Sequence, residues 1–269
     1  MNRLIYNLGF WTFILTGIST SNAQSKNICI SDSLFGNSEK HKVKVGIKSG
    51  NKMWNFRFGD YHITKSKTGW LTSTEKSNFL YTKTESKSKY KFSLTLANKT
   101  RDTAIVNSLN KTSIKELHSF ELFKNFHVGY DEVAKQYEFF TSFITLNNYK
   151  DEIWELLIEN TYDKNFDSKN ISFLKHKQRV IHINPVSSKQ CSKDKRWFPA
   201  LGYEFEENGE SLCAMQYFGG GLFGQNKYFV WLKTDLDPKL EFILSAAMTA
   251  IMEVRGPDYL EQMLFNDND

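Results

Sequence analysis

The chain has 269 residues, of which 40% are hydrophobic and 15% aromatic, and its formal net charge is +5. This apolar content excludes intrinsic disorder over most of the chain. The small positive excess gives no reason to expect a nucleic acid as partner, and it is compatible with contact with anionic lipid or polysaccharide.

The N-terminus has the pattern of a secretory signal peptide. Arg3 supplies the positive start, an apolar stretch runs from Leu4 to Ile18, and small residues stand at the recognition positions of Ser21 to Ala23. We predict a signal peptide over residues 1–23, cleaved between Ala23 and Gln24, and export to a periplasm or the extracellular space. The alternative is an N-terminal membrane anchor, which the short and interrupted apolar core disfavours.

The first half of the mature chain has the pattern of an antiparallel meander. Apolar and polar residues alternate with a period of two from Lys42 to about Leu109, as in strands that are wet on one face. Three segments show the alternation most clearly: Val43–Ile47, Trp54–Phe58 and Phe92–Leu96. Between them, Ser66–Gly69 and Thr84–Lys89 have the composition of turns.

The middle of the chain is more ambiguous. Glu138–Leu146 and Asp151–Asn160 are apolar enough to be strands or short helices, and their aromatic and β-branched residues favour strands. Val180–Ile183 is predicted to be a short strand that Asn184-Pro185 ends. Ser187–Arg196 is polar and basic, which is typical of a long surface loop.

The C-terminal third begins with a predicted hairpin. Leu201–Glu206 and Ser211–Phe218 flank Asn208-Gly209, a dipeptide that favours the tight turn of a hairpin. A third strand is predicted over Lys227–Lys233, after a glycine-rich loop.

A helix is predicted over Lys239–Val254. Its apolar residues leave no polar stripe, so we expect protein to enclose it on every side. Asp235 or Asp237 is the expected N-cap, followed by Pro238 near the first helical position. At roughly 24 Å the helix is short for a bilayer crossing, so we expect no transmembrane segment in the mature chain.

The chain shows no sign of a division into several domains. It shows no repeat of fixed period and no low-complexity linker, which predicts a single β-rich domain over residues 24–257 with an acidic tail over residues 258–269. Of the three cysteines, Cys191 and Cys213 are a possible disulfide that leaves Cys29 spare, and buried free thiols are the alternative.

The order of the C-terminal elements carries a family resemblance. A Gly-Tyr-Glu-Phe strand, an Asn-Gly turn, two more strands, an acidic Asp235-x-Asp237 junction and an apolar helix follow one another over Leu201–Val254. This order resembles tubby-like domains, including the LURP-one-related and phospholipid scramblase groups. The resemblance implies an antiparallel barrel around a central C-terminal helix. Several members engage membrane lipids through basic residues, but we match none of the lysines here to a family lipid site, and the export signal departs from a mostly intracellular family.

Catalytic and cofactor signatures are sparse. Gly219-x-Gly221-x-x-Gly224 matches a dinucleotide fingerprint, but a strand is predicted where that fingerprint needs a helix, so we expect no cofactor. The histidines show neither HExxH nor cysteine-partnered spacing, and we expect no metal. No Gly-x-Ser-x-Gly elbow is present. Carboxylates that could serve glycoside hydrolysis are Asp60, Asp131, Glu132, Glu204 and Glu206, and nothing singles out two of them.

Positive charge is concentrated in four segments: Lys40–Lys52, Lys83–Lys91, Lys175–Arg179 and Lys189–Arg196. Each can be a solvated outer face, but the last lies beside aromatic residues, which suits an anionic headgroup or a sugar acid. We predict a ligand loop formed by Lys193, Lys195, Arg196 and Trp197.

The expected function is an exported, non-catalytic module that binds an anionic amphiphile or glycan at the cell envelope. The alternative is a secreted or periplasmic hydrolase of envelope or extracellular polymers, with a site built from unlinked acids and histidines. The lack of a catalytic signature favours binding.

Overall fold

The computed structural model describes residues 27–46, 53–69, 71–77, 83–117, 120–123, 126–128, 132–163, 166–191, 194–196, 198–221 and 227–256. The predicted signal peptide, its cleavage site at Ala23 and Gln24, and the predicted tail over residues 258–269 lie outside these ranges.

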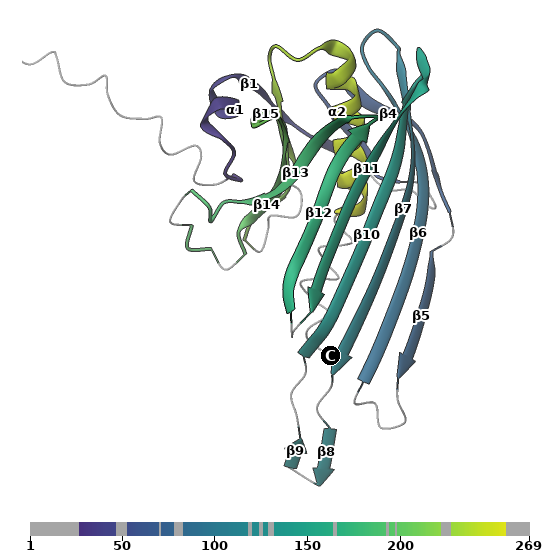
Figure 1. Ribbon diagram of the computed structural model, residues 1–269, viewed down its shortest axis with the longest axis vertical. Coiled ribbons are helices and arrows are strands. Elements are labelled where there is room, and N and C mark those ends of the chain that lie inside the picture. The colour runs from purple at the N-terminus through teal and green to yellow at the C-terminus, as the bar shows by residue number, and fades with distance from the viewer. Residues whose placement is uncertain are drawn as a thin grey trace, which may run out of the picture.

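The described chain is mainly β and ends in a long helix (Figure 1). The helices are α1 (Asp32–Gly36) and α2 (Pro238–Val254). The strands of the first half are β1 (Ser38–Lys42), β2 (Lys44–Gly46), β3 (Asn55–Phe58), β4 (Tyr61–Thr68), β5 (Thr72–Ser77), β6 (Lys83–Ala97), β7 (Thr103–Leu117), β8 (Phe120–Phe123) and β9 (Phe126–Val128). The second half contributes β10 (Glu132–Leu146), β11 (Tyr149–Asp163), β12 (Phe166–His176), β13 (Arg179–Ser187), β14 (Ala200–Glu207), β15 (Glu210–Gly219) and β16 (Phe229–Lys233).

One antiparallel sheet curls so far that its two edge strands, β1 and β2, are consecutive in the sequence. The order is β1-β16-β15-β14-β13-β12-β11-β10-β7-β6-β4-β3-β2, with β5 beside β6, while β8 and β9 form a separate pair. Only Val43 separates β1, which pairs with β16, from β2, which pairs with β3. The amide of Val43 donates to the carbonyl of Tyr228 at 3.1 Å. The sheet is thereby nearly closed into a barrel.

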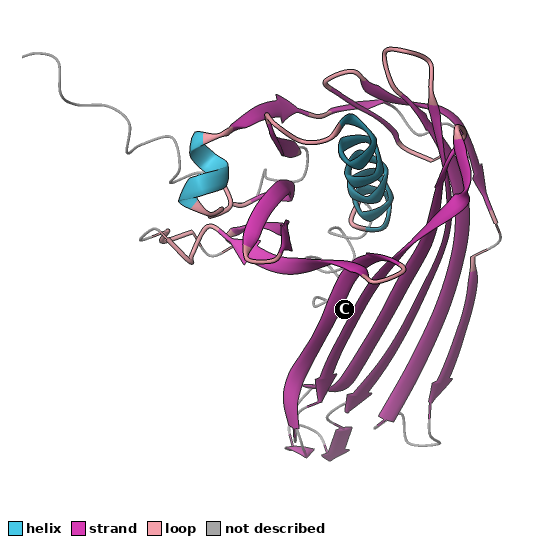
Figure 2. Cartoon of the chain, turned by 45° about the horizontal axis from the view of Figure 1, so that its top comes forward, coloured by secondary structure: helices cyan, strands magenta, loops and turns pink. Residues whose placement is uncertain are grey.

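The helix α2 lies inside this curve (Figure 2). Its residues from Phe242 to Val254 are all buried, and the carboxylate of the N-cap Asp237 accepts a hydrogen bond from the amide of Leu240 at 3.0 Å. Phe242 stacks on Tyr61 of β4 with ring centroids 5.5 Å apart. The predicted mainly-β barrel with a buried C-terminal helix is therefore confirmed, and the arrangement is compatible with a tubby-like fold. Among the described helices, neither is long and apolar enough to cross a membrane.

The hairpin and the ambiguous middle strands form as predicted. Asn208 and Gly209 both have positive φ, 53° and 81°, as the tight turn between β14 and β15 requires. Glu138–Leu146 lies within β10, and Asp151–Asn160 lies within β11.

Two predicted turns are wrong. Ser66–Thr68 belongs to β4, and Thr84–Lys89 lies within β6, where it pairs with β5 on one side and with β7 on the other. Figure 1 shows the reason, because the lower halves of β6, β7, β10 and β11 extend past the end of α2 as a single-layer sheet. No described helix or strand packs on either face of this extension, so its strands need no apolar alternation and have the composition of turns.

The predicted end of a strand at Asn184-Pro185 is also wrong, because β13 continues to Ser187. Pro185 pairs with Tyr203 of β14, while the pairing of β13 with β12 reaches only to His182. Pro185 therefore stands where β13 has one neighbouring strand, a position at which the missing amide hydrogen is tolerated.

An N-terminal strap over residues 27–37 crosses the outside of β13–β16. Ile28, Ile30 and Leu34 are buried there in a second apolar cluster that includes Trp231 of β16. A disulfide joins Cys29 of the strap to Cys191.

This disulfide corrects the predicted pairing of Cys191 with Cys213. Cys213 is a buried free thiol that faces the barrel core from β15, whereas Cys191 lies in an exposed turn outside the barrel. Burial raises the pKa of the Cys213 thiol well above its usual value, which makes it unreactive.

Candidate functional site

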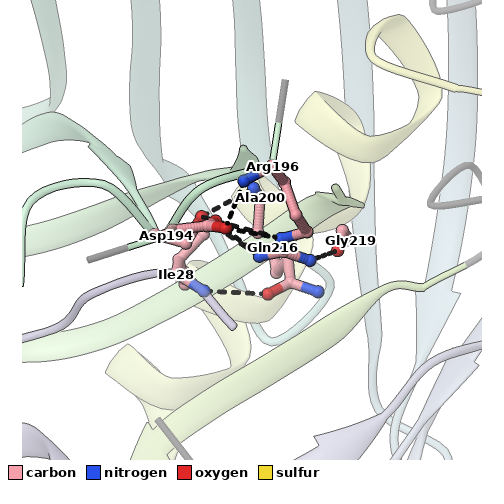
Figure 3. Close-up of polar contacts among 7 residues, drawn as sticks. Ile28, Asp194, Arg196, Ala200, Gln216 and Gly219 are labelled. Carbon is pink, nitrogen blue, oxygen red and sulfur yellow. Dashed lines mark hydrogen bonds and ion pairs between the residues drawn. The ribbon is translucent and has the colours of Figure 1, made fainter. Parts of the chain in front are cut away.

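The predicted ligand loop is held together by its own side chains. Lys193 and Trp197 lie outside the described residues, Lys195 is exposed, and Arg196 is half-buried. The Arg196 guanidinium donates to the carboxylate of Asp194 at 2.8 Å and to the carbonyl of Gly219 at 2.8 Å (Figure 3). The guanidinium of Arg196 therefore forms these hydrogen bonds with groups of the protein itself.

Asp194 compensates the charge of that guanidinium. Its side chain is only 3% exposed, and it also accepts a hydrogen bond from the Ser188 hydroxyl. The hydrogen bond from Arg196, followed by that from Ser188, lowers the pKa of Asp194 well below its usual range. The pair is thus ionised and close to neutral in sum, so that Lys195 is the remaining cation among the described residues 194–196.

The strap and the loop are joined next to this pair. The side-chain oxygen of Gln216 accepts from the amide of Ile28 at 3.0 Å, and its side-chain nitrogen donates to the carbonyl of Lys227 at 2.9 Å. Figure 3 shows the hydrogen bond of Gln216 with Ile28 together with the Asp194–Arg196 pair. Gln216 thus fixes the strap to β15, and the Cys29–Cys191 disulfide joins the strap to the loop.

A different and larger concentration of cations lies on the outer face of the sheet. Alternation places the apolar residues Phe92, Leu94 and Leu96 of β6 inside, so the residues between them point out. We define the basic face as the exposed outward lysines of β4–β7 and the start of β10: Lys65, Lys67, Lys76, Lys87, Lys89, Lys91, Lys111, Lys115 and Lys135.

The basic face places like charges directly opposite one another. Lys89 of β6 is paired with Lys111 of β7. Lys115 of β7 is paired with Lys135 of β10, but Lys115 is also opposite Glu85 of β6 and Lys135 is also opposite Asp163 of β11. Side chains directly opposite in an antiparallel pair have Cβ atoms about 4.5–5.5 Å apart, and like charges there are destabilising. The other cross-strand partners of Lys89 and Lys111 are Thr72 and Phe139, so the fold holds these two lysines together at a cost in stability.

Among the described side chains of β4–β7, Glu85 is the one carboxylate on this outer face. It forms an ion pair with Lys87 at 2.9 Å. The hydrogen bond from Lys87 lowers the pKa of Glu85, as do the charges of Lys115 and Lys76. The direction of this shift is that expected in a positive field.

The acids that could serve a hydrolase are engaged in other contacts. Glu204 accepts from the amide of Ser31 at 3.0 Å, and Glu206 accepts from the side chain of Asn184 at 3.2 Å. Asp131 and the side chain of Glu132 lie outside the described part of the chain, and Asp60 stands in the turn after β3.

One buried acid lies at the C-terminal end of α2. Glu138 of β10 binds the guanidinium of Arg255 through both oxygens, at 2.6 and 2.7 Å, and accepts from the side chain of Asn160 at 3.0 Å. Arg255 also donates to the hydroxyl of Tyr203 at 3.1 Å. This cluster connects the end of the helix to β10 and β14, and the charges of Glu138 and Arg255 neutralise each other.

The glycine motif does not have the context of a dinucleotide site. Gly219 ends β15, Gly220 and Gly221 have positive φ, and the next described element is the strand β16. Within the described ranges, no group of three or more His, Cys, Asp or Glu side chains is arranged to hold a metal ion.

Comparison with known proteins gives no further guide to the site: the chain matches no protein-family model, no curated protein and no solved structure. The sequence did contain a signal for the basic face, since Lys87, Lys89 and Lys91 recur with the period of a strand. The wrong prediction of a turn over Thr84–Lys89 concealed it.

Proposed function

We propose that the chain is an exported, non-catalytic module that binds an anionic ligand, an amphiphile or a glycan of the cell envelope, through the basic face. The observation that carries this proposal is the direct opposition of Lys89 to Lys111, neither of which faces an acid on its other side. A surface that serves only solubility gains nothing from such pairs, whereas an anion bound between them turns the repulsion into attraction.

Two further features support parts of the proposal. The Cys29–Cys191 disulfide suits an oxidising compartment, in agreement with the predicted signal peptide. We also propose a tubby-like fold, because the nearly closed antiparallel sheet encloses a C-terminal helix whose order of preceding elements resembles that family. The proposed anionic ligand follows from the lysines of this chain and not from the ligands of that family.

The test compares three pairs of lysines with the same change of charge. Residues 24–269 are purified, and binding to dextran sulfate and to phosphatidylglycerol vesicles is measured at two salt concentrations. The variants are Lys89→Gln/Lys111→Gln on the basic face and Lys193→Gln/Lys195→Gln in the predicted loop. The exposed control is Lys99→Gln/Lys150→Gln at the other end of the strands, where Lys99 lies in the turn after β6 and Lys150 lies at the start of β11.

We expect salt-sensitive binding by the wild type. The basic-face pair should lose about 2 kcal/mol, since each lysine near an anionic surface contributes about 1 kcal/mol. The control pair should keep wild-type affinity. An equal loss of affinity in all three variants would show that net charge alone governs binding. A loss confined to Lys193→Gln/Lys195→Gln would show that the loop, and not the basic face, is the binding site.

A further inference from the structure

The strands β7 and β11 flank β10 and carry matching residues on the outer face of the sheet. Phe140 and Ile144 of β10 face the barrel core, so the residues that alternate with them point outward. Each of these outward residues has one cross-strand partner on β7 and one on β11. From Thr145 to Phe139 the partners form four couples: Ile105 and Ile153, Asn107 and Glu155, Leu109 and Leu157, and Lys111 and Glu159. Two couples are thus identical and apolar, and one couple is oppositely charged.

The apolar residues of this surface are open to solvent. Ile105, Phe143 and Ile153 are 43%, 48% and 52% exposed. The helix α2 packs on the inner side of β7 and β10, and in Figure 1 the strands β10 and β11 lie in front of it with their outer face open. Among the described elements, none packs on the outer side of these strands. Side chains of this size are seldom left so open close together without a partner.

The charged couple lacks opposite charges within its own sheet. The cross-strand neighbours of Lys111 are Lys89 and Phe139. Those of Glu159 are Phe139 and Ile171. Phe139 therefore stands between the cation and the acid, whose strands lie two strand spacings, or about 10 Å, apart. The register thus gives the cation no acid directly opposite it and gives the acid no cation.

A twofold axis laid along the outer side of β10 makes this pattern self-complementary. Rotation about an axis parallel to the strands places β7 of one copy over β11 of the other at the same level. The isoleucines of the first couple then meet across the contact, as do the leucines of the third, and Lys111 meets Glu159 of the second copy. Every contact occurs twice, as in an isologous interface, and two sheet faces stacked in this way lie about 10 Å apart.

We infer that a second copy of the chain docks on the outer face of β7, β10 and β11 and forms a symmetric dimer. The charge pattern favours a second copy over an unrelated partner, because matched couples on both sides of one strand are what a twofold contact requires. The inference goes beyond the proposed function and does not rest on it. Lys111 belongs to both surfaces, so dimerisation is measured without any polyanion.

The curvature of the sheet limits the size of this contact. The outer face is convex, so the strands next to the axis touch and those farther away diverge (Figure 2). Three strands over nine residues cover about 15 by 30 Å, or roughly 450 Å² on each copy. This is the size of a weak interface, so we expect a dissociation constant in the micromolar range.

The experiment exchanges the charges between two variants, Lys111→Glu and Glu159→Lys. In sedimentation velocity at low salt, each variant alone should dimerise about tenfold more weakly than the wild type, because both charged contacts become repulsive. An equimolar mixture should dimerise like the wild type, since both acids of Lys111→Glu then face both lysines of Glu159→Lys. Rescue in the mixture is the decisive result, because damage within one chain cannot be repaired by another. Lys99→Glu, in the exposed turn after β6, is the control for the change of charge and should dimerise normally.

A second pair of variants tests the apolar contact. Ile153→Gln should weaken the dimer about tenfold, because the side chain is buried twice in the contact. Phe35→Gln changes a residue of α1 that is 44% exposed and should leave the dimer unchanged. Urea unfolding of each variant shows that it is folded.

Each contrary outcome overturns the inference. A wild type that stays monomeric at high micromolar concentration excludes the dimer, while binding of dextran sulfate still decides the proposed function separately. A wild-type dimer without rescue in the mixture places the contact elsewhere on the surface. If the two charge variants do not fold, equal dimerisation of Ile153→Gln and Phe35→Gln overturns the inference in their place.

Discussion

Replacing Lys89 with glutamate should stabilise the fold. Lys89 stands directly opposite Lys111, and Lys87 and Lys91 flank it on the same face of β6. Two exposed unit charges about 8 Å apart in water interact by about 0.5 kcal/mol, so reversing one of them turns a repulsion of that size into an attraction. The pair with Lys111 alone yields about 1 kcal/mol, at the upper end of measured cross-strand effects.

The assay is urea and thermal unfolding of the wild type, Lys89→Gln and Lys89→Glu at low and at high salt. In low salt the gain should grow from Gln to Glu, and 1 kcal/mol corresponds to about 2–4 °C in Tm for a chain of this size. At 1 M salt the gain should vanish, because the Debye length falls to about 3 Å. The same Lys89→Glu protein should bind dextran sulfate more weakly, so that stability and binding move in opposite directions.

The reasoning would be refuted by Lys89→Glu unfolding at a lower urea concentration than the wild type in low salt. It would also be refuted by a gain that persists in 1 M salt, since such a gain cannot be electrostatic.

Three other predictions concern the elements that hold this surface in place. Glu138→Gln should cost about 3–5 kcal/mol in urea unfolding, because it leaves the buried charge of Arg255 uncompensated, and a loss below about 1 kcal/mol would contradict that. Cys29→Ala/Cys191→Ala should cost about 2–5 kcal/mol, and a reductant should lower the wild type to the same urea midpoint; an unchanged midpoint in reductant speaks against the disulfide. Because the folded pKa of Asp194 is lowered, its contribution is complete above its unfolded pKa and is lost as pH falls through the folded value. Thermal unfolding below about pH 5 should therefore narrow the gap between wild type and Asp194→Asn, and parallel pH profiles would disprove it.

The elements that sequence reasoning finds best are those whose signal is local. The helix over Lys239–Val254 lacks any polar stripe, and Asn208-Gly209 is a dipeptide that readily adopts the positive φ angles of its turn. Neither depends on which strands become neighbours. Both therefore stand close to where the sequence places them.

What the sequence conceals depends on pairing. Thr84–Lys89 looks like a turn because both of its faces are polar, and it becomes a strand because β5 and β7 pair with it from the two sides. The disulfide partner of Cys191 is set by the path of the N-terminal strap, which spacing along the chain does not reveal.

Strand pairing also decides which of the positively charged residues remain without a nearby acid. In the sequence, Arg196 stands in a basic run and suggests a ligand, but Asp194, two residues away, neutralises it within the loop. In the fold, Lys89 and Lys111 come from separate runs and are brought together by the register of β6 and β7. A run of charge within one loop can be compensated cheaply by a local acid, whereas charge collected across strands persists unless an acid faces it in register. Cross-strand register is therefore the better guide to where this chain presents uncompensated positive charge.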